Sequence, residues 1–187
     1  HSFPTRRSSD LTRRRRLLLA LLLLPLVLLK LVHHSGASEY EPDPSLYQDI
    51  AAHVRDGDGL VTDVSLFNAG YSYFPHPIAL YPLWPLVLGH CARVLPIEWL
   101  AVWLPTLCYF AMLLLAYRLT VRVAPGPLFP GRAPDVDAGH AAVLVLGFTN
   151  PMFFTTSQPF TEGLAYLLLV VAMLRTYALC AQPGVAR

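Results

Sequence analysis

The chain has 187 residues, of which 55% are hydrophobic and only 14% are charged, and its mean hydropathy is +0.47. A soluble domain usually carries about 25% charged residues, so this composition indicates an integral membrane protein. The formal net charge of +2 is small, and no basic face with interleaved aromatic residues is present, which argues against nucleic acid as a partner.

The N-terminal part combines a leader, a basic cluster and a leucine-rich run. Residues 1–12 are expected to be a non-native or disordered leader and are left out of the predicted fold. The arginines at 13–16 precede an apolar run at 17–33. This run fits a membrane anchor or the core of a cleaved signal peptide, and we favour the anchor because further apolar segments follow. Both interpretations place the next residues outside the cytoplasm.

The segment that follows, residues 34–97, is predicted to be an extracytoplasmic loop, and its first part, up to Pro77, is polar. Within it, Leu46, Ile50 and Val54 recur at helical spacing. This spacing predicts an amphipathic helix at 45–55 that lies on the membrane surface. The sequence Asp-Gly-Asp-Gly that begins at Asp56 predicts a turn.

The apolar stretch 78–95 is ambiguous in hydropathy but contains Pro82 and Pro85 as well as His90 and Arg93. We therefore expect a juxtamembrane helix that stays outside. The positive-inside rule agrees, because this choice leaves the arginine-rich loop after the next span in the cytoplasm.

Three further spans are predicted, at 98–117, 140–156 and 163–181, within a single transmembrane domain that covers residues 13–182. The tail at 183–187 follows an apolar segment directly, so the chain is expected to be truncated. The predicted fold class is all-α, a polytopic transmembrane helical protein whose first outer loop carries juxtamembrane helices.

Three short motifs occur in a characteristic order along these segments. They are Asp43-x-x-x-Tyr47 after the first span, the aromatic-proline cluster Tyr81-Pro82-Leu83-Trp84-Pro85, and Asn150-Pro151 followed by Thr161-Glu162. Together they resemble the N-terminal part of GT-C superfamily glycosyltransferases, multi-spanning enzymes that take sugars from polyprenyl-phosphate donors. The similarity is to mannosyltransferases related to the GPI second mannosyltransferase and to the protein O-mannosyltransferase and aminoarabinose transferase branch.

The resemblance implies roles for particular residues. Asp43 would be the general base toward an acceptor hydroxyl, and Glu162 would orient the acceptor or help Asp43 hold a divalent cation. Magnesium or manganese fits such carboxylate ligands. The implied substrate-binding residues are Tyr47, Tyr81, Trp84 and His76. The chain departs from that branch in having Asp43-Pro44 where Asp-Glu is common, so the second carboxylate is missing.

Each of these residues also has a structural explanation. Asp43 could be a turn residue between two prolines, and Glu162 could be an acid favoured at a helix start. The aromatic residues could form the interfacial belt of a membrane protein. The aspartates at 56, 58 and 63 could bind a cation, although a solvated loop is the more common arrangement.

The function expected from these residues is transfer of a sugar, mannose by resemblance, from a polyprenyl-phosphate donor to a glycan, lipid or protein acceptor. The expected location is the bacterial inner (cytoplasmic) membrane, in contact with membrane lipid and with the active site facing outside the cytoplasm. Two alternatives remain: a non-enzymatic polytopic membrane protein, such as a transporter half or assembly factor, and a secreted or anchored protein with a cleaved signal.

Overall fold

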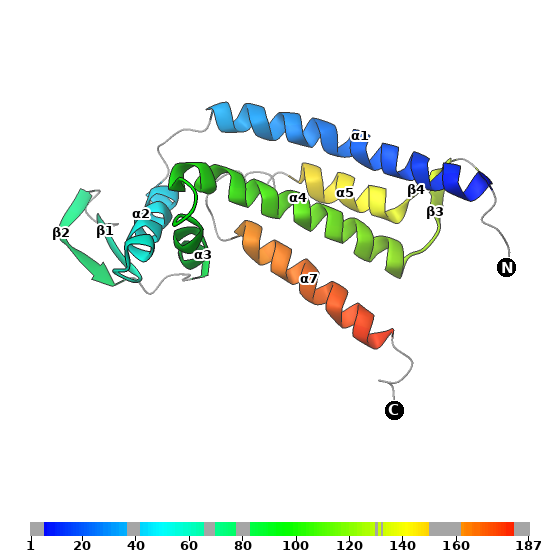
Figure 1. The fold of residues 1–187 in the computed structure, drawn as a ribbon. Helices are drawn as coiled ribbons and strands as arrows, with labels where there is room; N and C mark the ends of the chain where they lie inside the picture. The colour runs from blue at the N-terminus through cyan, green and yellow to red at the C-terminus, as the bar shows by residue number, and fades with distance from the viewer. Residues whose placement is uncertain are drawn as a thin grey trace. The chain divides into compact units, whose positions relative to one another are not determined.

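The computed structural model describes residues 6–36, 42–65, 70–77, 83–129, 131, 133–149 and 162–181. These residues form six helices and two antiparallel two-stranded sheets (Figure 1). The fold is therefore mostly helical, as predicted. The all-α class is wrong in detail, because the chain also forms two β-hairpins that were not predicted. The chain divides into two compact units: unit 1 comprises residues 1–32, 110–153 and 168–187, and unit 2 comprises residues 33–109 and 154–167.

Unit 2 is built around two helices of the first polar loop, α2 (Pro42–Asp56) and α3 (Leu83–Cys91). The predicted apolar face of α2 exists, and Leu46, Ile50 and Val54 are all buried together. Leu60 and Leu86 pack against them. This face therefore packs against protein instead of lying on a lipid surface, because α3 supplies a second apolar surface.

A close approach of backbones joins these two helices. A Cβ atom added at Gly89 of α3 would lie 2.7 Å from the Ala51 carbonyl oxygen and 2.7 Å from the Val54 side chain on α2. Only glycine fits this contact. A neighbouring cluster of Ala51, Leu88, Ala92, Ile97 and Leu100 continues the core into the start of α4 (Ile97–Val123).

A β-hairpin completes the described part of unit 2, with β1 (Val61–Ser65) paired to β2 (Gly70–Pro77). The turn predicted after α2 is confirmed: Gly57 and Gly59 adopt φ of 100° and 91°, conformations that favour glycine. These glycines end α2 and allow β1 to return beside it. The hairpin itself was missed, although three of the five residues of β1 are β-branched and β2 contains three aromatic residues.

Unit 1 contains most of α1 (Arg6–Gly36), part of α4, the hairpin of β3 (Pro127–Phe129) with β4 (Ala133–Asp137), α5 (Ala138–Phe148) and most of α7 (Glu162–Cys180). Helix α1 begins at Arg6, so part of the expected leader at 1–12 is helical. Tyr177 of α7 donates a hydrogen bond to the Arg122 carbonyl oxygen of α4 at 2.9 Å.

A buried polar network joins three elements of unit 1. Asp137 caps α5 by accepting from the backbone N–H of His140 at 3.2 Å, and it also accepts from the Tyr117 hydroxyl at 3.2 Å. Arg15 lies 3.6 Å from the same carboxylate. His140 Nε2 donates to the Arg15 carbonyl oxygen at 3.0 Å, and Nδ1 lies 2.8 Å from Asp137 Oδ1. The arginine end of α1 is thereby held against the start of α5.

Two of the described helices, α4 and residues Gly163–Cys180 of α7, are long and apolar enough to cross a membrane. They correspond to the predicted spans at 98–117 and 163–181. Helix α1 contains the predicted run at 17–33 but carries Lys30 within it. Helix α5 has eleven residues and is only about 16 Å long, short of a bilayer core of about 30 Å. Residues 150–156, the last part of the span predicted at 140–156, lie outside the described part of the chain.

Candidate functional site

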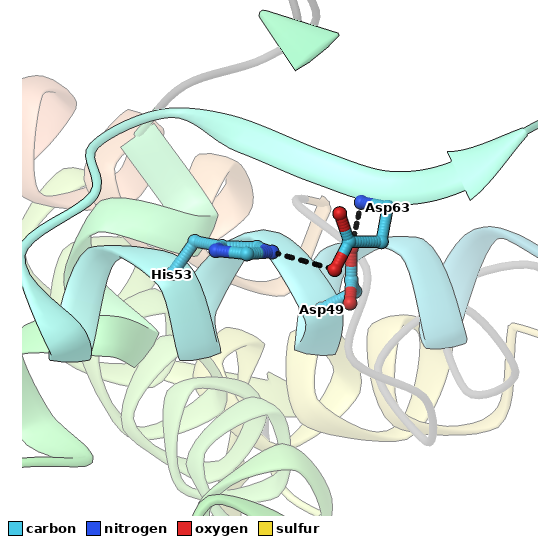
Figure 2. A group of neighbouring side chains, drawn as sticks. All are labelled: Asp49, His53 and Asp63. Carbon is cyan, nitrogen blue, oxygen red and sulfur yellow. Dashed lines mark hydrogen bonds and ion pairs between the residues drawn. The ribbon is translucent and has the colours of Figure 1, made fainter. Parts of the chain in front are cut away.

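In the described part of unit 2, a group of polar side chains lies where α2, the turn after it and β1 meet. Asp49 and His53 are four residues apart on α2, so they share one face of the helix. The turn brings Asp63 of β1 beside that face (Figure 2). The polar side of α2 is therefore covered by a strand that carries a further carboxylate.

Asp49 is tied to the strand by two hydrogen bonds. Its Oδ2 atom accepts from the Thr62 hydroxyl at 2.5 Å and from the backbone N–H of Asp63 at 2.8 Å. Thr62 is fully buried. These bonds fix the orientation of the Asp49 carboxylate and hold β1 against α2.

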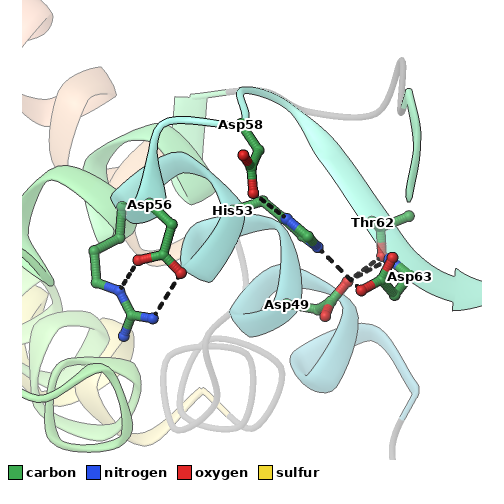
Figure 3. A network of polar contacts seen from close by, with 7 residues as sticks. Asp49, His53, Asp56, Asp58, Thr62 and Asp63 are labelled. Atoms are coloured by element: carbon green, nitrogen blue, oxygen red, sulfur yellow. Dashed lines mark hydrogen bonds and ion pairs between the residues drawn. The ribbon is translucent and has the colours of Figure 1, made fainter. Parts of the chain in front are cut away.

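His53 lies between two carboxylates (Figure 3). Its Nδ1 atom is 3.0 Å from Asp58 Oδ2, and its Nε2 atom is 3.4 Å from Asp63 Oδ2. The hydrogen bond with Asp58 raises the pKa of His53, partial burial lowers it, and the charges of Asp49 and Asp63 raise it again, with a net increase. The acidic surroundings therefore favour a positive charge at this position.

Three carboxylates surround His53, those of Asp49, Asp58 and Asp63. Arg55, two residues along the chain from His53, forms two hydrogen bonds of 2.8 and 2.9 Å with Asp56. The immediate surroundings of His53 are therefore acidic.

The same residues provide a set of possible metal ligands. One ligand atom from each of Asp49, His53 and Asp63 can be chosen so that all three lie within 4.8 Å of one another. Two carboxylates and one imidazole are borderline ligands, suited to first-row divalent metals. Among the described residues, this group is the one that could hold a metal ion with three side chains of these types.

The two carboxylates predicted to be catalytic lie elsewhere in unit 2. Asp43 is the second residue of α2, which begins three residues earlier than the predicted helix at 45–55. Glu162 is the first residue of α7. Both residues belong to unit 2, but their side chains are outside the described part of the chain, as is the divalent-metal site predicted on them.

The residues predicted to bind substrate are distributed differently. Tyr47 is 7% exposed and Trp84 is 1% exposed, so both side chains lie in the interior of unit 2. Among the described residues none accepts a hydrogen bond from the buried Trp84 Nε1. The backbone of His76 pairs with Thr62 across the β1–β2 hairpin, while its side chain lies outside the described part, as does Tyr81 entirely. Their roles stay predictions.

Sequence reasoning missed Asp49 and His53 and treated Asp63 as one of several solvated aspartates. The spacing of Asp49 and His53 on the polar face of a predicted helix was a usable signal. The position of Asp63 beside these two residues could not be predicted from the sequence, because it depends on a strand that returns along α2. No known protein family matches the chain, and neither a curated protein nor a solved structure is detectably similar to it.

Proposed function

We propose that the chain is part of a membrane glycosyltransferase of the GT-C type. It transfers a sugar, mannose by resemblance, from a polyprenyl-phosphate donor to an acceptor outside the cytoplasm. The observation that carries the proposal is that Asp43 and Glu162, far apart in sequence, both belong to unit 2. The motif order that led to these two residues supports the same reaction.

The local positions of these residues suit the chemistry. Each stands in the first turn of a helix, where the helix dipole stabilises a carboxylate in its ionised form. An ionised carboxylate can accept the proton of an attacking hydroxyl or bind a divalent cation beside a departing phosphate. Glycosyl transfer needs both a proton acceptor and stabilisation of negative charge. The acceptor hydroxyl loses its proton as it attacks an oxocarbenium-like centre, and the leaving group is an anion.

The contact between Arg15 and Asp137 supports the topology that this function requires. If α1 and α4 each cross the membrane once, the basic end of α1 and the start of α5 lie on the same side. A third crossing by the apolar stretch 78–95 would separate them, and the described helix there, Leu83–Cys91, covers nine residues. The arginine-rich side is then cytoplasmic, and the loop that forms most of unit 2 faces outward.

The test uses membranes that contain the full-length protein of which the chain is proposed to be part, together with a radiolabelled polyprenyl-phosphate mannose. We expect Asp43→Asn and Glu162→Gln each to lower transfer at least about 100-fold, the lower range for loss of a general base. Asp56→Asn is the matched control, because Asp56 is exposed and hydrogen-bonded to Arg55, and it should keep wild-type transfer.

Normal sugar transfer by the Asp43→Asn protein would show that Asp43 is not the general base. Wild-type membranes that carry the inserted protein but transfer no sugar from any polyprenyl-phosphate donor would favour the non-enzymatic alternative. Insertion is checked in every sample by resistance of the protein to carbonate extraction, so that loss of transfer is not confused with loss of the protein.

A further inference from the structure

We propose that Asp49, His53 and Asp63 form a binding site for a first-row divalent transition metal of the Zn²⁺ type. The inference concerns the polar face of α2 and the strand beside it, and it stands independently of the proposed sugar transfer. It also differs from the metal site predicted on Asp43 and Glu162. Two observations carry it: the ligand spacing and the orientation of the imidazole.

The spacing matches that of ligands sharing an ion. Two ligands bonded at about 2.0–2.1 Å to a tetrahedral ion lie about 3.4 Å apart. His53 Nε2 and Asp63 Oδ2 are 3.4 Å apart, and the ligand atom of Asp49 completes a triangle with no side longer than 4.8 Å. A fourth position is left for water, as in zinc sites with three protein ligands.

The imidazole is oriented as a metal ligand would be. A ligating histidine usually donates its other ring N–H to a carboxylate, which fixes the tautomer and aims the lone pair at the ion. His53 Nδ1 lies 3.0 Å from Asp58 Oδ2, so Nε2 is the nitrogen directed at Asp63. Asp58 is a positioning residue in this arrangement. Asp49 is oriented in a similar way by Thr62.

The ligand types favour Zn²⁺ over Mg²⁺. An imidazole suits Zn²⁺, whereas Mg²⁺ prefers oxygen ligands and keeps its water shell. A divalent ion shared by Asp49, His53 and Asp63 would also link α2 to β1.

The experiment measures metal binding by the purified protein in detergent, prepared with a tag that contains no histidine and stripped with EDTA. Isothermal titration with ZnCl₂ should show one ion bound per chain, with weaker binding of Mn²⁺ and weaker still of Mg²⁺. Co²⁺ should produce the visible absorption bands of a four-coordinate site. Asp58→Asn should weaken Zn²⁺ binding about 10–100-fold, as loss of a partner that orients a ligand does.

His53→Ala and Asp49→Asn should each abolish stoichiometric binding and the Co²⁺ bands. His90→Ala is the matched control, because His90 is exposed on α3 and hydrogen-bonded to the Leu86 carbonyl oxygen, and it should bind Zn²⁺ like the wild type. Circular dichroism verifies that each variant is folded, and the two ligand variants act on different residues. Absence of a 1:1 complex in the wild type, or equal binding by the wild type and both folded ligand variants, would overturn the inference.

Discussion

The described residues of each unit include an Asp–His network, and the two networks differ in how deeply they are buried. In unit 1, His140 is 3% exposed, and both ring nitrogens are engaged, one near Asp137 and the other at the Arg15 carbonyl oxygen. In unit 2, His53 Nε2 faces a carboxylate at ion-sharing distance, and the network borders solvent. The same two residue types therefore hold two helices together in one unit and form a candidate ligand site in the other.

The two networks differ because of their burial and not because of their residue types. A buried polar group must be satisfied by protein partners, because the cost of leaving it unpaired is about 1–3 kcal/mol or more. The network around Asp137 satisfies that requirement with Arg15, Tyr117 and a helix cap. A network at the surface does not have to be completed by protein, because water can supply the remaining hydrogen bonds. The Asp63 side chain is 36% exposed and can therefore be reached by a cation from solvent.

The largest effect should come from breaking the buried network. We expect Asp137→Ala to destabilise unit 1 by about 3–5 kcal/mol, because it removes one partner of a buried charge pair and leaves the others unmatched. Hydrogen exchange read separately over α5 and over α2 would measure it. Protection should fall in α5 and stay unchanged in α2. An equal loss in both helices would mean that the two units unfold as one.

Smaller effects should follow from filling the tight glycine contacts, one in each unit. A Cβ atom at Gly139 would lie 2.6 Å from the Tyr117 ring, and one at Gly89 would lie 2.7 Å from Ala51 and Val54. Gly139→Ala and Gly89→Ala should each cost about 1–3 kcal/mol, the usual range for overpacking. Urea unfolding in micelles would measure the cost. An effect at only one position would show that the other unit yields to the added methyl group.

The smallest effect should be a pH dependence confined to unit 2. The folded pKa of His53 is raised, mainly by its hydrogen bond to Asp58, above an unfolded value of about 6.5. Its contribution to stability is therefore complete below about pH 6.5 and is lost as the pH rises through the raised pKa. Hydrogen exchange of α2 in EDTA should reveal this loss. The His53→Gln protein, which cannot titrate there, should lack it.

Several local features could be predicted because they depend on neighbouring residues. The helix through Leu46, Ile50 and Val54 follows from their spacing, and the turn at Gly57 and Gly59 follows from glycine's freedom at positive φ. The long apolar segments of α4 and α7 were evident from composition. These predictions required no knowledge of what lies beside each element.

The candidate ligand site could not be predicted in this way, because it depends on which elements lie side by side. Asp49 and His53 were already on one helix face, but Asp63 joins them only because β1 folds back along α2 and bonds to Asp49. The apolar face of the same helix was assigned to lipid, whereas α3 covers it.

The sequence by itself determined where helices form, where the chain turns and which segments are apolar enough for a membrane, since these properties arise within a few residues. Only the tertiary structure decided which surface each face of α2 meets and which of the two Asp–His networks is closed by protein partners. The reason is that contacts between distant segments depend on packing and charge complementarity between surfaces that local periodicity does not specify.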